Sequence, residues 1–268
     1  MSSPFSRKGC ALGCGGALVV ALVLIGFSVM QVRQINQRAF EAGDEIDARF
    51  GTIDDFRPSA GPAITPEQLE RFIEVRLAVM GVCDEFGGMH AGMIAMTEPG
   101  ASGGANLWNN ISRGMHRIRA IVAAPGLLGE FAGIRNEALL EQNMGMGEYV
   151  WIYALVFYTA LGEEPVLNKT ETRPGNIADN ARFALMGMME RRASALRSAG
   201  LDEEADLWEQ EKTLMINEPH RVPFADGVPA ALATVIESRR EVLAALFCTH
   251  TDALELMRLS RNRLGYEG

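Results

Sequence analysis

Near its middle the chain reads Glu148-Tyr-Val-Trp-Ile-Tyr-Ala-Leu-Val-Phe-Tyr-Thr-Ala-Leu161, the most aromatic stretch of the protein's main body. Apart from Glu148 at its start, a helix built from this stretch is apolar on every face. Such a helix is buried in the centre of a protein or spans a membrane. The stretch is too short to cross a bilayer, which takes about 20 apolar residues. We therefore predict the central core helix of a helical body here.

The rest of the body is also predicted to be helical. Runs of alternating β-branched residues are absent, while Ala, Leu, Met, Glu and Arg dominate. The clearest helix start is Thr65-Pro-Glu-Gln68. Thr65 can cap the helix, Pro66 suits its first position, and Gln68 can complete a capping box. Apolar residues then recur at three- and four-residue spacing as far as Cys83, which predicts a buried face.

Proline and glycine positions divide the remaining helices. Pro99 to Gly104 and Pro165 to Gly175 interrupt the helical pattern, as do prolines at 219, 223 and 229. The last helix is expected to be one long element with one apolar face and Gly265 as its stop. The predicted helices after the first are residues 105–123, 127–144, 148–161, 177–198 and 229–264, with another opening at Leu201.

A second apolar stretch lies near the N-terminus. Gly9 to Val32 carries no charged side chain, and residues 17–27 are apolar on every helical face. A bilayer core of about 30 Å takes roughly 20 such residues. Arg7 and Lys8 precede the stretch, and no small-residue cleavage site ends it, which favours an uncleaved anchor over a signal peptide. The sequence therefore predicts one transmembrane helix at 9–32.

The fold class expected is all-α, with one N-terminal transmembrane helix followed by an irregular helical bundle. Arg7 and Lys8 favour a cytoplasmic N-terminus. Only three lysines stand among 25 basic residues, a bias that indicates a bacterial source. We therefore expect a single-pass protein of the bacterial inner membrane with a periplasmic body. The expected parts are a tail at 1–8, the transmembrane helix at 9–32, a stalk and linker at 33–64, and a helical extracytoplasmic domain at 65–268.

Composition limits the partners. The chain carries a net charge of −9, and an acidic body repels phosphate backbones. Nucleic acid is therefore not expected as a partner. The expected partners are the membrane, through residues 9–32, and another envelope protein.

Two of the four cysteines, Cys83 and Cys248, lie in the predicted body. In an oxidising compartment they are a candidate disulfide between its first and last helices. Both positions also fit apolar helix faces as free thiols, and the sequence leaves the two alternatives open.

The candidate metal site is Met89-His90-Ala-Gly-Met93-Ile-Ala-Met96. On a helix, Met89, Met93 and Met96 share a face and His90 neighbours Met93. Thioether sulfur suits Cu(I), and an imidazole can complete such a site. The alternative is a methionine stripe that packs in a core or against a neighbour. Copper is accordingly the candidate cofactor.

Motifs for catalysis are absent. The chain has no His-Glu-x-x-His, no Gly-x-Ser-x-Gly, no Walker loop and no Cys-x-x-Cys. We nominate no catalytic residues. The first hypothesis is a non-enzymatic binding or scaffold subunit of the cell envelope, since an anchor raises the concentration of a body near membrane partners. The alternatives are a periplasmic copper-handling protein and an enzyme with an unrecognised site between helices, which a polar pocket with convergent acids and histidine would favour.

Two segments, Thr65-Pro-Glu-Gln-Leu-Glu-Arg-Phe-Ile-Glu-Val-Arg76 and Gly147-Glu-Tyr-Val-Trp-Ile-Tyr153, resemble segments of uncharacterised membrane-anchored helical proteins of bacteria. They cover under a tenth of the chain, and neither is a chemical motif. The resemblance implies an extracytoplasmic helical body and assigns no activity or site residue.

Overall fold

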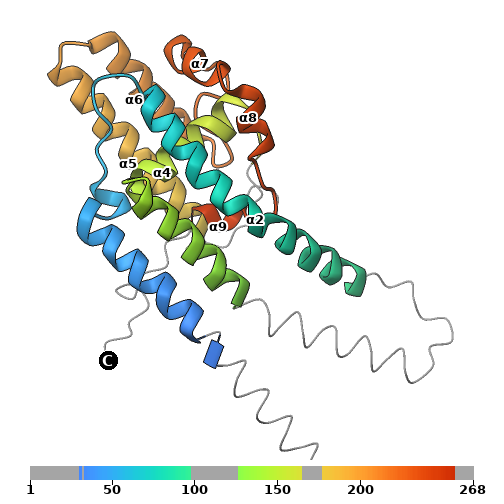
Figure 1. The fold of residues 1–268 in the computed structure, drawn as a ribbon. Coiled ribbons are helices and arrows are strands. Elements are labelled where there is room, and N and C mark those ends of the chain that lie inside the picture. The colour runs from blue at the N-terminus through green and yellow to red at the C-terminus, as the bar shows by residue number, and fades with distance from the viewer. Residues whose placement is uncertain (1–29, 32, 98–125, 165–176, 257–268) are drawn as a thin grey trace, which may run out of the picture.

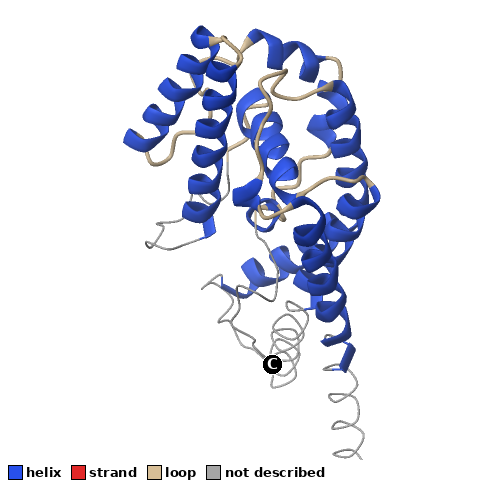
Figure 2. Cartoon of the chain, turned by 90° about the vertical axis from the view of Figure 1, so that its left-hand side faces the viewer, coloured by secondary structure: helices blue, strands red, loops and turns tan. Residues whose placement is uncertain are grey.

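A computed structural model describes residues 30–31, 33–97, 126–164 and 177–256; within these, the side chains of 88–97, 177–181 and 253 are not described. The described chain is helical and contains no strand, which confirms the all-α prediction (Figures 1 and 2). The elements are unlabelled helices at 33–50 and 126–141, η1 (Ile53–Asp55), α2 (Pro66–Thr97), α4 (Met146–Tyr153), η2 (Ala154–Ala160), α5 (Ile177–Ser198), α6 (Asp202–Asn217), α7 (Ala230–Glu237), α8 (Arg240–Ala245) and α9 (Asp252–Glu255).

The central helix is confirmed. α4 continues directly into η2, a seven-residue π-helix, and every residue from Tyr149 to Thr159 is buried. Its aromatic rings contact rings on both sides: Trp151 stacks on Trp208 of α6 at 5.1 Å between centroids, and Tyr149 lies 5.4 Å from Phe72 of α2. Residues that were apolar on every helical face are thus surrounded by other helices on every face.

α2 begins as the sequence predicts. The backbone N–H of Thr65 donates to Gln68 Oε1 at 2.9 Å, and the backbone N–H of Gln68 donates to Thr65 Oγ1 at 3.2 Å. This reciprocal pair is a capping box, which satisfies two backbone donors that the first turn leaves without partners.

The segment expected as a stalk packs against the body instead. Ala39 and Ile46 of helix 33–50 are buried, and the Nδ2 of Asn136 donates to the Ala39 carbonyl at 3.1 Å. Helix 126–141 lies beside it, and Gly129 and Gly133 let the two backbones approach: a Cβ at Gly129 would overlap the side chain of Asn36. The sequence predicted a stalk here, because the close crossing depends on Gly129 and Gly133 of a distant helix, and glycines carry little hydropathy signal.

The prediction of a single C-terminal helix at 229–264 is wrong for the part of this segment that the structure describes. It is broken into α7, α8 and α9, with irregular backbone at Arg239 and again between Leu246 and Thr251. The buried positions Leu232, Ile236 and Leu243 do share the predicted face. A straight helix would carry its last residues past the body, whereas the breaks turn α9 back onto α2.

The predicted transmembrane helix lies outside the described residues except at Met30 and Gln31, and the helix predicted at 105–123 lies wholly outside them. Among the helices that are described, none combines the length and apolarity needed to cross a bilayer. The other predicted helices, 127–144 and 177–198, correspond to helix 126–141 and to α5.

Two glycines test the packing. A Cβ at Gly147 in α4 would overlap the Cβ of Phe56 and lie 3.3 Å from the Ile53 carbonyl oxygen, whereas a Cβ at Gly81 in α2 would meet nothing within 4 Å. We expect Gly147→Ala to lower the free energy of unfolding by about 1–3 kcal/mol. Gly81→Ala should raise it by about 0.5–1 kcal/mol, because alanine is the better helix former. Urea unfolding of both variants measures this, and equal effects would contradict the packing described.

Candidate functional site

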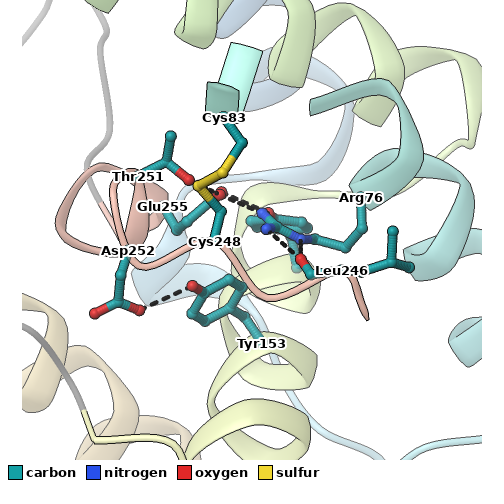
Figure 3. The surroundings of a disulfide bond; sticks show 9 residues. Arg76, Cys83, Tyr153, Leu246, Cys248, Thr251, Asp252 and Glu255 are labelled. Atoms are coloured by element: carbon teal, nitrogen blue, oxygen red, sulfur yellow. Dashed lines mark hydrogen bonds and ion pairs between the residues drawn. A yellow bond between two sulfur atoms is a disulfide. The ribbon is translucent and has the colours of Figure 1, made fainter. Parts of the chain in front are cut away.

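The most unusual feature of the interior is a charged group with no exposure to solvent. Arg76 of α2 is fully buried, and its guanidinium forms an ion pair with the equally buried Glu255 of α9 (Figure 3). The same guanidinium donates to the Leu246 carbonyl, at 2.7 Å from Nη2 and 3.2 Å from Nε, and to the Tyr149 hydroxyl at 3.0 Å. One arginine therefore ties together α2, α4 and the C-terminal segment.

The Glu255 carboxylate has further partners. It accepts from the Tyr149 hydroxyl at 2.6 Å and from Thr251 Oγ1 at 3.0 Å. Its backbone carbonyl accepts from Arg135 of helix 126–141 at 3.1 Å. Because a buried carboxylate is stable only when it is paired and hydrogen-bonded, these contacts hold α9 in one position.

A second buried carboxylate extends the network. Asp252 Oδ1 accepts from the hydroxyls of Tyr153 at 2.8 Å and Tyr158 at 2.7 Å. The guanidinium of Arg76 lies over the rings of Tyr153 and Phe157, at 5.3 and 5.5 Å from their centroids. With Arg135, the network holds two cations and two carboxylates, so its formal charge sums to zero.

Burial and pairing shift the pKa values of these groups. Burial acts to lower the pKa of Arg76, but Glu255 and Tyr149 outweigh it and raise that pKa above its ordinary value. Burial lowers the pKa of Arg135, an effect that Glu255 opposes. Burial also raises the pKa values of the tyrosines at 149, 153 and 158 well above 10. The hydroxyls are thus held protonated as donors to the carboxylates.

A disulfide lies against this network. Cys83 of α2 is bonded to Cys248 in the loop between α8 and α9, with 6.1 Å between their Cα atoms (Figure 3). Of the two alternatives left open by the sequence, the structure contains the disulfide. It closes a loop of 165 residues in sequence separation, for which the chain-entropy relation gives about 5 kcal/mol of stabilisation. Covalent bond and ion pair together fasten the C-terminal segment to α2.

An open cleft of about 660 Å³ lies on the other side of Tyr158. Among its lining residues are three glutamates and a histidine, namely Glu163, Glu164, Glu218 and His220. Arg221, also at the cleft, has its guanidinium engaged by Glu211 at 2.8 Å and by Asp226 at 2.6 Å. Glu164, Glu218 and His220 are exposed. The cleft is therefore an acidic surface hollow, and Tyr158 belongs both to its lining and to the buried network.

The predicted metal site lies in the last turns of α2. Met89, His90, Met93 and Met96 lie on the helical backbone of α2, but their side chains are outside those described. In the described part of the chain, no three His, Cys, Asp or Glu side chains are grouped so that they could hold a metal ion.

No sequence pattern predicted the buried network. Arg76, Tyr149, Asp252 and Glu255 were named in no site. One signal was present: Arg76 stands three residues after Ile73 and seven before Cys83, among the apolar positions of α2. A cation inside an apolar stripe indicates a buried partner, although only the fold identifies which carboxylate it is.

Comparison with known proteins adds no relative: no family model, no curated protein and no solved structure matches this chain.

Removing the central arginine should be far more damaging than removing an exposed one. Arg76→Met leaves Glu255 buried without its cation, and we expect the free energy of unfolding to fall by about 3–5 kcal/mol. The matched control is Arg239→Met, because Arg239 pairs with Glu70 at 2.6 Å but both side chains are about half exposed. That variant should lose less than about 1 kcal/mol.

The double variant Arg76→Met with Glu255→Gln should recover part of the loss, since no uncompensated charge stays buried. Urea unfolding of all three variants is the measurement. Equal losses for Arg76→Met and Arg239→Met would show that the buried pair does not organise the fold.

Because the tyrosine pKa values are raised, we expect the folded protein to lose stability at alkaline pH. Their pKa values are raised above 10 in the folded protein, whereas in the unfolded chain they release protons near pH 10. The folded state then binds more protons, so the free energy of unfolding falls as the pH rises above about 10 and is unaffected by these groups below it. Tyrosinate absorbance equivalent to three residues should appear only together with unfolding. Its appearance near pH 10 in folded protein would contradict the network.

Proposed function

We propose that this protein is a single-pass, membrane-anchored subunit of the bacterial cell envelope, whose helical body binds or positions another envelope protein without catalysing a reaction. Residues 9–32 form the anchor, the N-terminus is cytoplasmic, and the body is extracytoplasmic.

The Cys83–Cys248 disulfide is the observation that carries this proposal. Disulfides form and persist in oxidising compartments and are rare in the bacterial cytoplasm. The bond lies in the body, and the uncharged stretch at 9–32 precedes that body. A body in the periplasm, attached to the inner membrane by that stretch, accounts for both features.

The buried polar groups pair with one another, and this pairing supports a binding role. In catalytic sites, charged groups face a pocket that admits a substrate. Here the carboxylates of Asp252 and Glu255 accept from tyrosines, a threonine and Arg76, and all of these groups are buried. They stabilise the body's shape, which is what a scaffold requires.

The described surface also carries apolar side chains that a partner protein could cover. Phe183 of α5 is 65% exposed and Ile216 of α6 is 59% exposed. The two helices are held together close to these residues, because Arg182 donates to the backbone carbonyls of Glu218 and Pro219. Exposed aromatic and branched side chains are common at protein interfaces.

The acidic cleft favours a second candidate, an enzyme or small-molecule binder acting there. It brings together Glu163, Glu164, Glu218 and His220 in a hollow large enough for a small ligand. Glu163→Gln and His220→Ala would abolish such an activity and leave a scaffold role unchanged. Copper handling through Met89, His90, Met93 and Met96 rests on the sequence pattern alone.

The first experiment is purification of the tagged full-length protein from its native membrane in mild detergent, with identification of the proteins and metals that accompany it. The proposal expects one stoichiometric envelope protein, whose recovery falls with Phe183→Glu plus Ile216→Glu. The matched control is Ser198→Glu, an exposed site at the other end of α5. A lone monomer without a bound ligand would contradict the proposal, and stoichiometric copper would favour the metal-handling alternative.

A further inference from the structure

We propose that the last turns of α2, residues 88–97, enter the boundary between lipid headgroups and acyl chains beside the anchor, and so form a second contact of the body with the bilayer. This inference rests on the proposed membrane anchoring by residues 9–32. The partner is the lipid surface itself.

Two helices of the body lie side by side and point the same way. Helix 126–141 runs parallel to helix 33–50: Gly129 lies beside Asn36, Gly133 lies beside Ala39, and Asn143 Oδ1 accepts from Arg49 at 3.4 Å. Each of these residue pairs therefore lies at the same level along the shared axis of the two helices. Helix 33–50 directly follows the uncharged stretch in sequence, and Met30 and Gln31 just before it are also helical, so its start marks the bilayer side of the body.

α2 contacts helix 126–141 through an aromatic pair, which fixes its level relative to the two parallel helices. The Phe86 ring lies 6.1 Å from the ring of Phe131. Phe131 stands between Gly129 and Gly133, which contact Asn36 and Ala39, so Phe86 lies at a level between Asn36 and Ala39. α2 runs toward the end of the body at which helix 33–50 starts, and its last turns project beyond the neighbouring helices (Figure 1).

Helix geometry then gives the reach of α2. Thr97 is eleven residues beyond Phe86, and α2 is helical to Thr97, which is about 16 Å at 1.5 Å per residue. Arg33 is the first charged residue after the uncharged stretch. On the same scale, the distance along the axis from the level of Phe131 to that of Arg33 is about 7 Å. Along the axis of helix 33–50, the end of α2 therefore passes the level of Arg33 by up to about 9 Å, which is within the depth of an interfacial helix in a bilayer.

The sequence of this end suits lipid contact. Residues 87–97 contain no Asp, Glu, Lys or Arg, and His90 is their one titratable residue. The uncharged run is too short to span a bilayer and has the length of an interfacial or re-entrant segment. The opposite end of α2 is different, since it begins with Glu67, Glu70, Arg71 and Glu74.

At the end of the body where helix 33–50 starts, the described side chains also suit a membrane interface. Met30 is 59% exposed and Leu128 is 36% exposed, at the starts of the two parallel helices. Arg33 and Arg38 are exposed just above them, at the level where lipid phosphates would lie.

The test is depth-dependent quenching in the full-length protein, reconstituted in vesicles of phosphatidylethanolamine and phosphatidylglycerol. Cys10 and Cys14 are replaced by serine, and Cys83 and Cys248 stay blocked in their disulfide. An environment-sensitive fluorophore is attached in turn to Ala95→Cys, to Met30→Cys as the anchor reference, and to Ser198→Cys as the distant control. Lipids with a nitroxide high on the acyl chain serve as the quencher.

We expect the labels at 95 and 30 to lose fluorescence to a similar extent and the label at 198 to lose none. Quenching at 30 without quenching at 95 would overturn this inference and leave the anchored body intact. Absence of quenching at both positions would overturn the anchoring as well. A copper titration of the reconstituted protein that removes quenching at 95 would assign the methionines to metal binding instead of lipid contact, which also overturns the inference.

Discussion

The buried ion pair between Arg76 and Glu255 is the constraint on which the rest of the body depends. A guanidinium without water must have its donors satisfied by the protein. Here they are satisfied by Glu255, the Tyr149 hydroxyl and the Leu246 carbonyl. The Leu246 carbonyl can accept from Arg76 because α8 has ended, so the break in the C-terminal helix and the buried arginine require one another.

The disulfide and the network reinforce each other. Cys248 lies two residues after Leu246 and seven before Glu255, while Cys83 lies two helical turns after Arg76. The covalent bond limits how far the C-terminal segment can move in the unfolded chain, and the ion pair fixes its orientation in the folded one. Tyr158 extends the same network toward the acidic cleft, so the shape of that surface also depends on the buried carboxylates.

The sequence predicted what local physics determines and missed what distant residues determine together. Thr65 and Gln68 are three residues apart, and the capping box they form was predicted correctly. The central helix at 148–161 was likewise evident from its uniform apolarity. Arg76 and Glu255 are 179 residues apart, and no spacing rule connects them. The packing of helix 33–50 depends on Gly129 and Gly133, whose lack of a side chain is what allows the close approach.

We propose that the body resides in an oxidising compartment, where the disulfide holds its C-terminal segment on α2. The most direct measurement is the state of Cys83 and Cys248 in intact cells, trapped by rapid acid quenching and alkylation and read by mass spectrometry of the linked peptides. We expect the two cysteines to be recovered as one disulfide-linked pair and to resist alkylation until a reductant is added after denaturation. Recovery of both as alkylated thiols from undisturbed cells would contradict it.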